Sequence, residues 1–68
     1  MISIHVNGEL RQCRRGLDLE TLLTELGYVP RLVVVEFNGT ILPRQQWRLQ
    51  QVGESDSLEI VTIVGGGL

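Results

Sequence analysis

The chain has 68 residues with a formal net charge of -2, and 43% of them are hydrophobic, which is enough for one small domain with a single core and no enclosed active-site cleft. Its six arginines are scattered, it has no lysine, and it has one cysteine and one histidine, which argues against nucleic-acid binding, a lysine nucleophile, an internal disulfide and a metal site. No apolar run approaches the roughly 20 residues of a membrane helix and the start lacks the features of a signal peptide, so we expect a cytoplasmic monomer that binds neither nucleic acid nor membrane.

The first predicted element is a β-hairpin. Residues 2–7 alternate apolar and polar side chains, as in a strand with one buried face. Asn7-Gly8 favours a type I′ turn, because both residues can adopt positive φ, and residues 9–14 then form the second strand. On this pattern His5 lies on the exposed face, and Cys13 is interpreted as a packing residue rather than a reactive thiol.

A short amphipathic helix is predicted next. Asp18 is placed as its N-cap, and leucines follow at helical spacing at positions 19, 22, 23 and 26. Gly27 is suited to the end of the helix, and Pro30 cannot continue it. We therefore expect two to three turns of helix with one apolar face.

The rest of the chain is predicted to be mostly β-structure. Residues 32–38 are rich in β-branched side chains, Asn38-Gly39 repeats the hairpin signal, and Pro43 places residues 40–43 at a sheet edge. Residues 44–49 are expected to be irregular or a single turn, with Trp47 covering one end of the core. A turn at 53–56 leads into the last strand, residues 57–64.

This order of elements predicts the fold class. Two strands, one helix and three further strands indicate an α+β protein, with one main helix packed on one face of a mixed sheet of four to five strands. With the first and last strands adjacent, the arrangement is a β-grasp (ubiquitin-like) roll. We expect residues 1–64 to form the β-grasp domain and residues 65–68 to form a flexible glycine tail.

The alternation along two strands predicts a docking surface. These side chains should face the helix: Val33, Val35, Phe37, Leu58 and Ile60. Val34, Val61 and Ile63 are left on the opposite face, and we predict that they form an exposed apolar patch to which partner enzymes dock. The alternative is that these residues only satisfy the preference of strands for β-branched side chains.

Three features together resemble the ubiquitin-like sulfur carriers. They are the β-grasp order, the pattern Gly-x-x-Asp-x-Leu-Glu-Ile at residues 53–60, and the tail Gly65-Gly66-Gly67. Within that superfamily, Phe-Asn-Gly at 37–39 and Ile-Leu-Pro-Arg-Gln-Gln-Trp at 41–47 are similar to the thiamine branch, the ThiS family. The resemblance covers the whole chain.

The resemblance implies a non-enzymatic sulfur carrier for the thiazole ring of thiamine. Its sulfur-carrying C-terminus would be Gly67 with Gly66, preceded by Gly65 of the tail. An adenylating, E1-like activating enzyme would use ATP to activate the carboxylate, a sulfurtransferase or cysteine desulfurase would supply sulfur for a thiocarboxylate at Gly67, and thiazole synthase would receive it. The carrier itself should bind no cofactor, since it has no phosphate-binding glycine-rich loop at a helix start.

The sequence leaves some alternatives open. The same tail chemistry would serve a sulfur carrier for molybdopterin or another sulfur-containing product, and a β-grasp protein-interaction module would need only an inert tail. The family pattern ends on glycine, whereas this sequence continues to Leu68. Leu68 is a residue left at a vector junction, an extension removed by processing, or a terminus that disables the carrier, and we favour the first.

Overall fold

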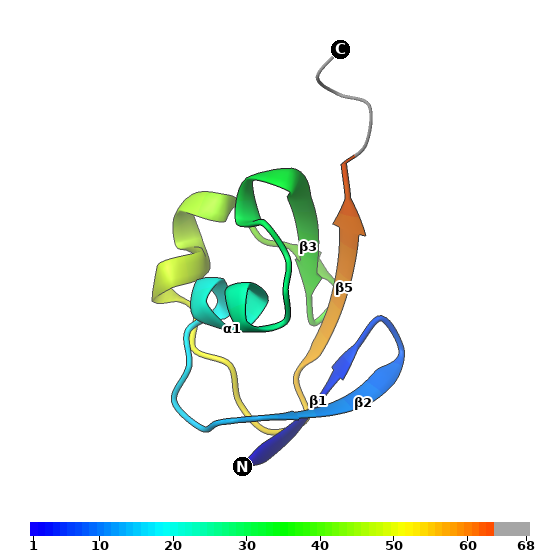
Figure 1. Ribbon diagram of the computed structural model, residues 1–68, viewed down its shortest axis with the longest axis vertical. Helices are drawn as coiled ribbons and strands as arrows, with labels where there is room; N and C mark the ends of the chain where they lie inside the picture. The colour runs from blue at the N-terminus through cyan, green and yellow to red at the C-terminus, as the bar shows by residue number, and fades with distance from the viewer. Residues whose placement is uncertain (64–68) are drawn as a thin grey trace.

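The structure, a computed structural model, describes residues 1–63 and places five strands in one mixed sheet. The strand order is β2-β1-β5-β3-β4, with β1 and β5 parallel and all other neighbours antiparallel. The α-helix of the described residues, α1, lies on one face of this sheet (Figure 1). The predicted α+β, β-grasp architecture is confirmed.

The chain begins with the predicted hairpin of β1 (Ile2–Val6) and β2 (Glu9–Cys13). Asn7 and Gly8 have φ values of +52° and +82°, as a type I′ turn requires. The Asn7 side chain also bonds to β5. Its Nδ2 donates to the Ile60 carbonyl at 3.3 Å, and its Oδ1 accepts from the Ile60 N–H at 2.6 Å. The turn residue therefore fastens the hairpin to the neighbouring strand.

Helix α1 (Leu19–Glu25) begins at the predicted N-cap. The Asp18 carboxylate accepts hydrogen bonds from the Thr21 N–H at 3.0 Å and from the Thr21 hydroxyl at 2.7 Å. Leu26 is the C-cap, and Gly27 follows with a φ of +96°, a conformation that glycine adopts without strain. The buried leucines at positions 19, 22 and 23 turn one face of the helix toward the sheet.

Two 3₁₀ turns flank the second hairpin and shorten its strands. β3 (Val33–Phe37) starts one residue later than predicted, because Pro30 begins a 3₁₀ turn, η1 (Pro30–Leu32). β4 (Thr40–Ile41) lies at the sheet edge as predicted but has only two residues. Pro43 lies outside it, at the start of the second 3₁₀ turn, η2 (Arg44–Leu49).

The core lies between α1, η2 and the inner face of the sheet. Trp47 of η2 is 1% exposed, and its Nε1 donates to the Leu42 carbonyl at 2.9 Å, which satisfies the one polar atom of the indole. Phe37, predicted as buried, is only half-buried, because it ends β3 next to an exposed turn. The buried apolar residues are Ile2, Ile4, Val6, Cys13, Leu19, Leu22, Leu23, Val33, Val35, Trp47, Val52, Leu58 and Ile60.

Candidate functional site

The predicted sulfur-carrying tail follows the central strand of the sheet. Gly65, Gly66 and Gly67, together with Leu68, lie outside the described residues. The strand that leads to them is β5 (Ser57–Thr62), which pairs with β1 and β3 and runs toward the end of the molecule opposite the N-terminus (Figure 1). Past its end, the Ile63 N–H donates to the Leu32 carbonyl at 2.7 Å. The chain is thus hydrogen-bonded up to the last described residue.

The predicted docking residues are all exposed. Val34, Val61 and Ile63 are 40%, 63% and 48% exposed, respectively. The structure brings Val34 and Val61 together, because they are register partners in the antiparallel β3–β5 pair. Ile63 follows directly after β5 and does not line the depression that these two valines share. The two valines are therefore exposed and adjacent on the sheet, and their role in docking stays a prediction.

The outer face of the sheet, on the side away from α1, contains an open depression that adds three residues to this surface. Its lining consists of Val34, Glu36, Ile41, Glu59 and Val61. Ile41 of β4 is 62% exposed and pairs with Glu36, and the sequence interpretation did not include it in the surface. The two-residue Asn-Gly turn was the available signal, since it sets Ile41 opposite Glu36 in the hairpin register.

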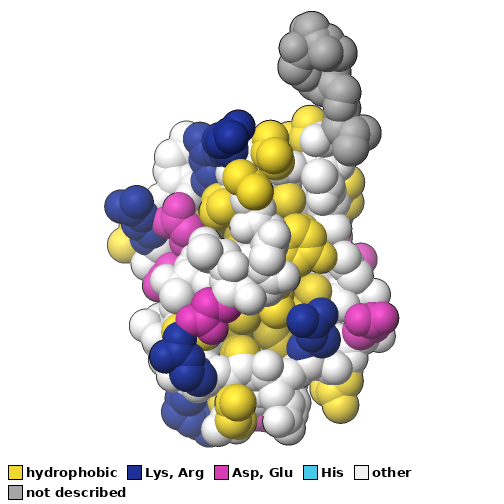
Figure 2. Space-filling model, viewed as in Figure 1, with side chains coloured by type: hydrophobic (Ala, Val, Ile, Leu, Met, Phe, Trp, Pro, Cys, Tyr) yellow, Lys and Arg dark blue, Asp and Glu magenta, His cyan; other side chains and the backbone are white. Residues whose placement is uncertain are grey.

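Two carboxylates lie side by side on this outer face. Glu36 and Glu59 are register partners in the β3–β5 pair, next to the Val34–Val61 pair. The ion pairs found within residues 1–63 join Arg14 to Glu25 and Arg48 to Glu20, so neither involves these two carboxylates. Figure 2 shows arginine side chains in several places on one face of the molecule. Arg44 shares one depression with Arg31 and another with Arg48, and none of these three lines the depression at the valine pair. The surface is therefore apolar at the valine pair and acidic beside it.

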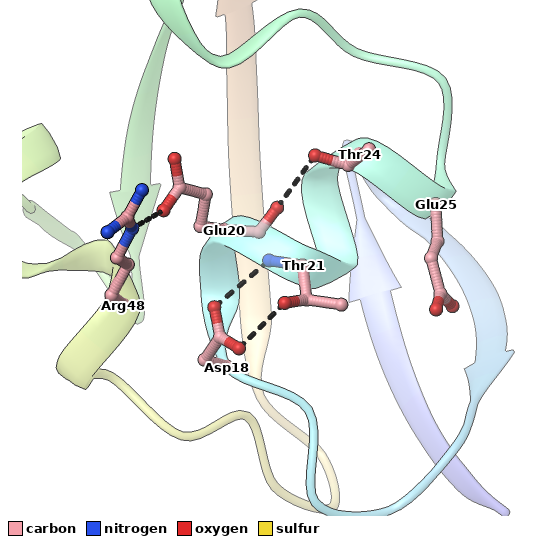
Figure 3. A pocket seen from close by; sticks show the side chains of 6 residues that line it. All are labelled: Asp18, Glu20, Thr21, Thr24, Glu25 and Arg48. Carbon is pink, nitrogen blue, oxygen red and sulfur yellow. Dashed lines mark hydrogen bonds and ion pairs between the residues drawn. The ribbon is translucent and has the colours of Figure 1, made fainter.

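A second depression lies over the first turns of α1 (Figure 3), with Asp18, Glu20, Thr21, Thr24, Glu25 and Arg48 around it. Its polar side chains already bond within the chain. The Thr24 hydroxyl donates to the Glu20 carbonyl at 3.1 Å, and Arg48 Nε donates to Glu20 Oε1 at 2.7 Å. The hydrogen bonds from Thr21 lower the pKa of Asp18. These contacts are explained by helix capping and helix packing.

Cys13 and His5 occupy the positions that the sequence predicts. Cys13 is 7% exposed and belongs to the core. Burial, followed by the nearby Glu25 carboxylate, raises the pKa of its thiol, which favours the unreactive protonated form. His5 is exposed on β1.

Among residues 1–63, no group of three or more His, Cys, Asp and Glu side chains is placed to hold a metal ion. No helix in that range is long and apolar enough to cross a membrane.

Comparison with known proteins gives one family. The ThiS family model matches residues 4–67. The chain is 39% identical to the uncharacterized protein ycf40 of Porphyra purpurea, over 97% of this chain and 93% of that protein. It is 27% identical to the sulfur carrier protein ThiS of Escherichia coli, over 97% of this chain and 100% of that protein. It is also 38% identical to a thiazole synthase of Magnetococcus marinus, over 97% of this chain but only 20% of that protein.

A solved structure is similar over nearly the whole chain. The crystal structure of the thiamine biosynthesis protein ThiS from Geobacter metallireducens has a TM-score of 0.83 and 29% sequence identity with this chain. The similarity covers 97% of this chain and 100% of that one. Sequence and fold therefore agree on the same family.

Proposed function

The chain belongs to the ThiS family, the sulfur carriers of thiamine biosynthesis, and we propose that it carries sulfur as a thiocarboxylate on Gly67. The observation that carries this proposal is the family match to residues 4–67, which includes all three tail glycines. Glycine suits such a tail, because without a Cβ it can pass through a narrow channel in a partner enzyme. The chain acts as a carrier, and its partners supply the catalysis.

In the proposed reaction sequence, the Gly67 carboxylate attacks the α-phosphate of ATP on an adenylating, E1-like activating enzyme. An acyl-adenylate forms and pyrophosphate leaves. A sulfurtransferase or cysteine desulfurase supplies sulfur as an enzyme-bound persulfide, and the terminal sulfur displaces AMP to give an acyl disulfide. A thiol, acting as the two-electron reductant, then attacks the enzyme-side sulfur of this disulfide, forms a new disulfide with it and releases the thiocarboxylate. ATP is a substrate of the activating enzyme, and we propose that the reaction takes place in the cytoplasm.

Thiazole synthase is the proposed acceptor of the sulfur. Thiazole synthases of Magnetococcus marinus and Paramagnetospirillum magneticum contain a segment similar to this chain, which spans 20% and 19% of their lengths. A carrier and its acceptor in one polypeptide meet at a high effective concentration. That arrangement supports a direct contact between this chain and a separate thiazole synthase, and it favours thiamine over molybdopterin as the product served.

The proposed docking surface is the apolar part of the outer sheet face, formed by Val34 and Val61 with the adjacent Ile63. These side chains are exposed, and the fold does not use them to cover its core. A partner that holds the tail after β5 would meet this face, since Val61 and Ile63 are the exposed apolar residues nearest the tail within residues 1–63. Apolar surface at the centre of an interface is a common source of binding energy.

The test uses the chain ending at Gly67 with the activating enzyme, ATP and a sulfur donor, and measures its intact mass. We expect the gain that corresponds to one terminal oxygen replaced by sulfur. The matched control is the chain ending at Leu68, which should stay unmodified because Gly67 has no free carboxylate there. An unmodified Gly67 chain, with the activating enzyme active on another carrier, would refute the proposal.

A further inference from the structure

The acidic pair on the outer sheet face makes no ion pair within the described part of the chain. Glu36 and Glu59 are opposite one another in the β3–β5 register, both are exposed, and neither takes part in an ion pair within residues 1–63. Like charges directly opposite each other destabilise an antiparallel pair of strands. The pair therefore adds repulsion to a central pairing of the sheet.

The surroundings of this pair are apolar on two sides. Val34 and Val61 form the next register pair on the same face of these two strands, and Ile41 is the neighbour of Glu36 on β4. These five side chains line one open depression. A partner group that fits it needs a positive charge for the two carboxylates and a flat or apolar part for the valines and the isoleucine.

We propose that this depression binds an arginine side chain that thiazole synthase presents among apolar residues, with Glu36 and Glu59 as its recognition residues. The inference rests on the proposed function for the identity of the partner. A guanidinium group is planar and weakly hydrated, and its five N–H donors can bond to two carboxylates while one face lies on apolar side chains. A lysine ammonium is a compact, strongly hydrated charge and matches the apolar floor less well.

This arrangement gives the acidic pair opposite effects in the free and bound protein. In the free protein the two carboxylates repel each other. In the complex the arginine neutralises both of them, so binding gains from the relief of that repulsion as well as from charge-assisted hydrogen bonds. A substitution that removes one charge should therefore stabilise the free chain and weaken the complex. A purely structural role would move both properties in the same direction.

The experiment measures the affinity of thiazole synthase from the same genome for the unmodified chain ending at Gly67, by calorimetry at low and high salt. Glu36→Gln and Glu59→Gln should each weaken binding about tenfold, the ratio that one well-formed charged contact supplies. The double variant should also lose most of the salt dependence. Both single variants should melt at the same temperature as the parent chain or higher.

Glu9→Gln is the matched control, because it removes the same charge at an exposed position of β2. Glu9 is the register partner of Val6, whose side chain faces the core, so Glu9 lies on the inner face of the sheet and not on the outer face with Glu36 and Glu59. The affinity of the Glu9→Gln variant for thiazole synthase should equal that of the parent chain. Equal affinities for the parent chain and both test variants would overturn the inference.

The result also separates this inference from the proposed function. A chain that becomes thiocarboxylated but does not bind thiazole synthase overturns the inference and leaves the carrier chemistry in place. A chain that is neither modified nor bound refutes both.

Discussion

The two faces of the β3–β5 pair carry similar apolar residues but differ in burial. Val35 and Leu58 on the inner face are 0% exposed, whereas Val34 and Val61 on the outer face are 40% and 63% exposed. The inner side chains pack under α1 and η2, and no helix or strand within residues 1–63 covers the outer ones. Burial separates the apolar residues that hold the fold from those that are available to a partner.

The largest loss of stability is expected for a substitution on the inner face. Leu58→Ala removes a fully buried side chain from between the sheet and α1 and leaves a cavity. The free energy of unfolding should fall by about 2–5 kcal/mol, a large part of the stability of so small a domain. Urea denaturation followed by circular dichroism measures this loss. A loss within about 0.5 kcal/mol, as for a surface position, would contradict the description of the core.

The next largest loss of stability is expected where the β1–β2 hairpin is hydrogen-bonded to β5. Asn7→Gly keeps a residue that accepts positive φ but removes both hydrogen bonds to Ile60. We expect a loss of about 1–3 kcal/mol, because the Ile60 N–H is left without its partner. Asn7→Ala should cost more, since alanine also strains the turn. Equal stabilities for the glycine variant and the parent chain would show that the side-chain bonds contribute nothing.

A smaller effect, dependent on pH, is expected at the cap of the helix that covers the inner face. The pKa of Asp18 is lowered from its ordinary value of 3.8 by hydrogen bonds from Thr21. A lowered pKa means that the ionised cap stabilises the fold above the ordinary value, and that this stability is lost as pH falls through the folded value. Asp18→Ala should therefore unfold at lower denaturant near neutral pH. The gap to the parent chain should narrow in acid, and a constant gap from neutral to acidic pH would contradict the assignment.

The smallest effect on stability is expected on the outer face. Val61→Thr keeps the branched shape at an exposed position, so the free energy of unfolding should change by no more than about 0.5 kcal/mol. Val35→Thr makes the same change on the inner face and should cost about 1–3 kcal/mol, because it buries a hydroxyl. Binding to thiazole synthase should weaken for Val61→Thr. A similar stability loss at both positions would contradict the distinction between the faces.

Most of the fold follows from local signals in the sequence. The Asn-Gly turns, the Asp18 cap and the alternation of the strands each act within a few residues, so they predict the hairpins, the helix and its buried face. The shortening of β3 by a 3₁₀ turn and the two-residue length of β4 depend on competition at Pro30 and Pro43. Such boundaries are not specified by periodicity alone.

The sequence predicts which residues of the site are exposed, but not which of them are neighbours on the sheet. The exposure of Val34 and Val61 follows from alternation within each strand. Their contact, and the opposition of Glu36 and Glu59, depend on which strands are neighbours and in which register. β3 and β5 are distant in the sequence, so this pairing becomes visible only in the folded chain. The tail residues Gly65, Gly66 and Gly67 were singled out by chemistry and by resemblance, and they lie outside the described residues.

The most direct test of the central claim follows the sulfur from the carrier to its acceptor. The thiocarboxylated chain ending at Gly67 is mixed with thiazole synthase and its other substrates, and in parallel with the large subunit of molybdopterin synthase, and its intact mass is measured over time. The account predicts that the mass returns to that of the carboxylate only with thiazole synthase. Sulfur that stays on the carrier there, or leaves it only in the parallel reaction, would contradict a role in thiamine biosynthesis.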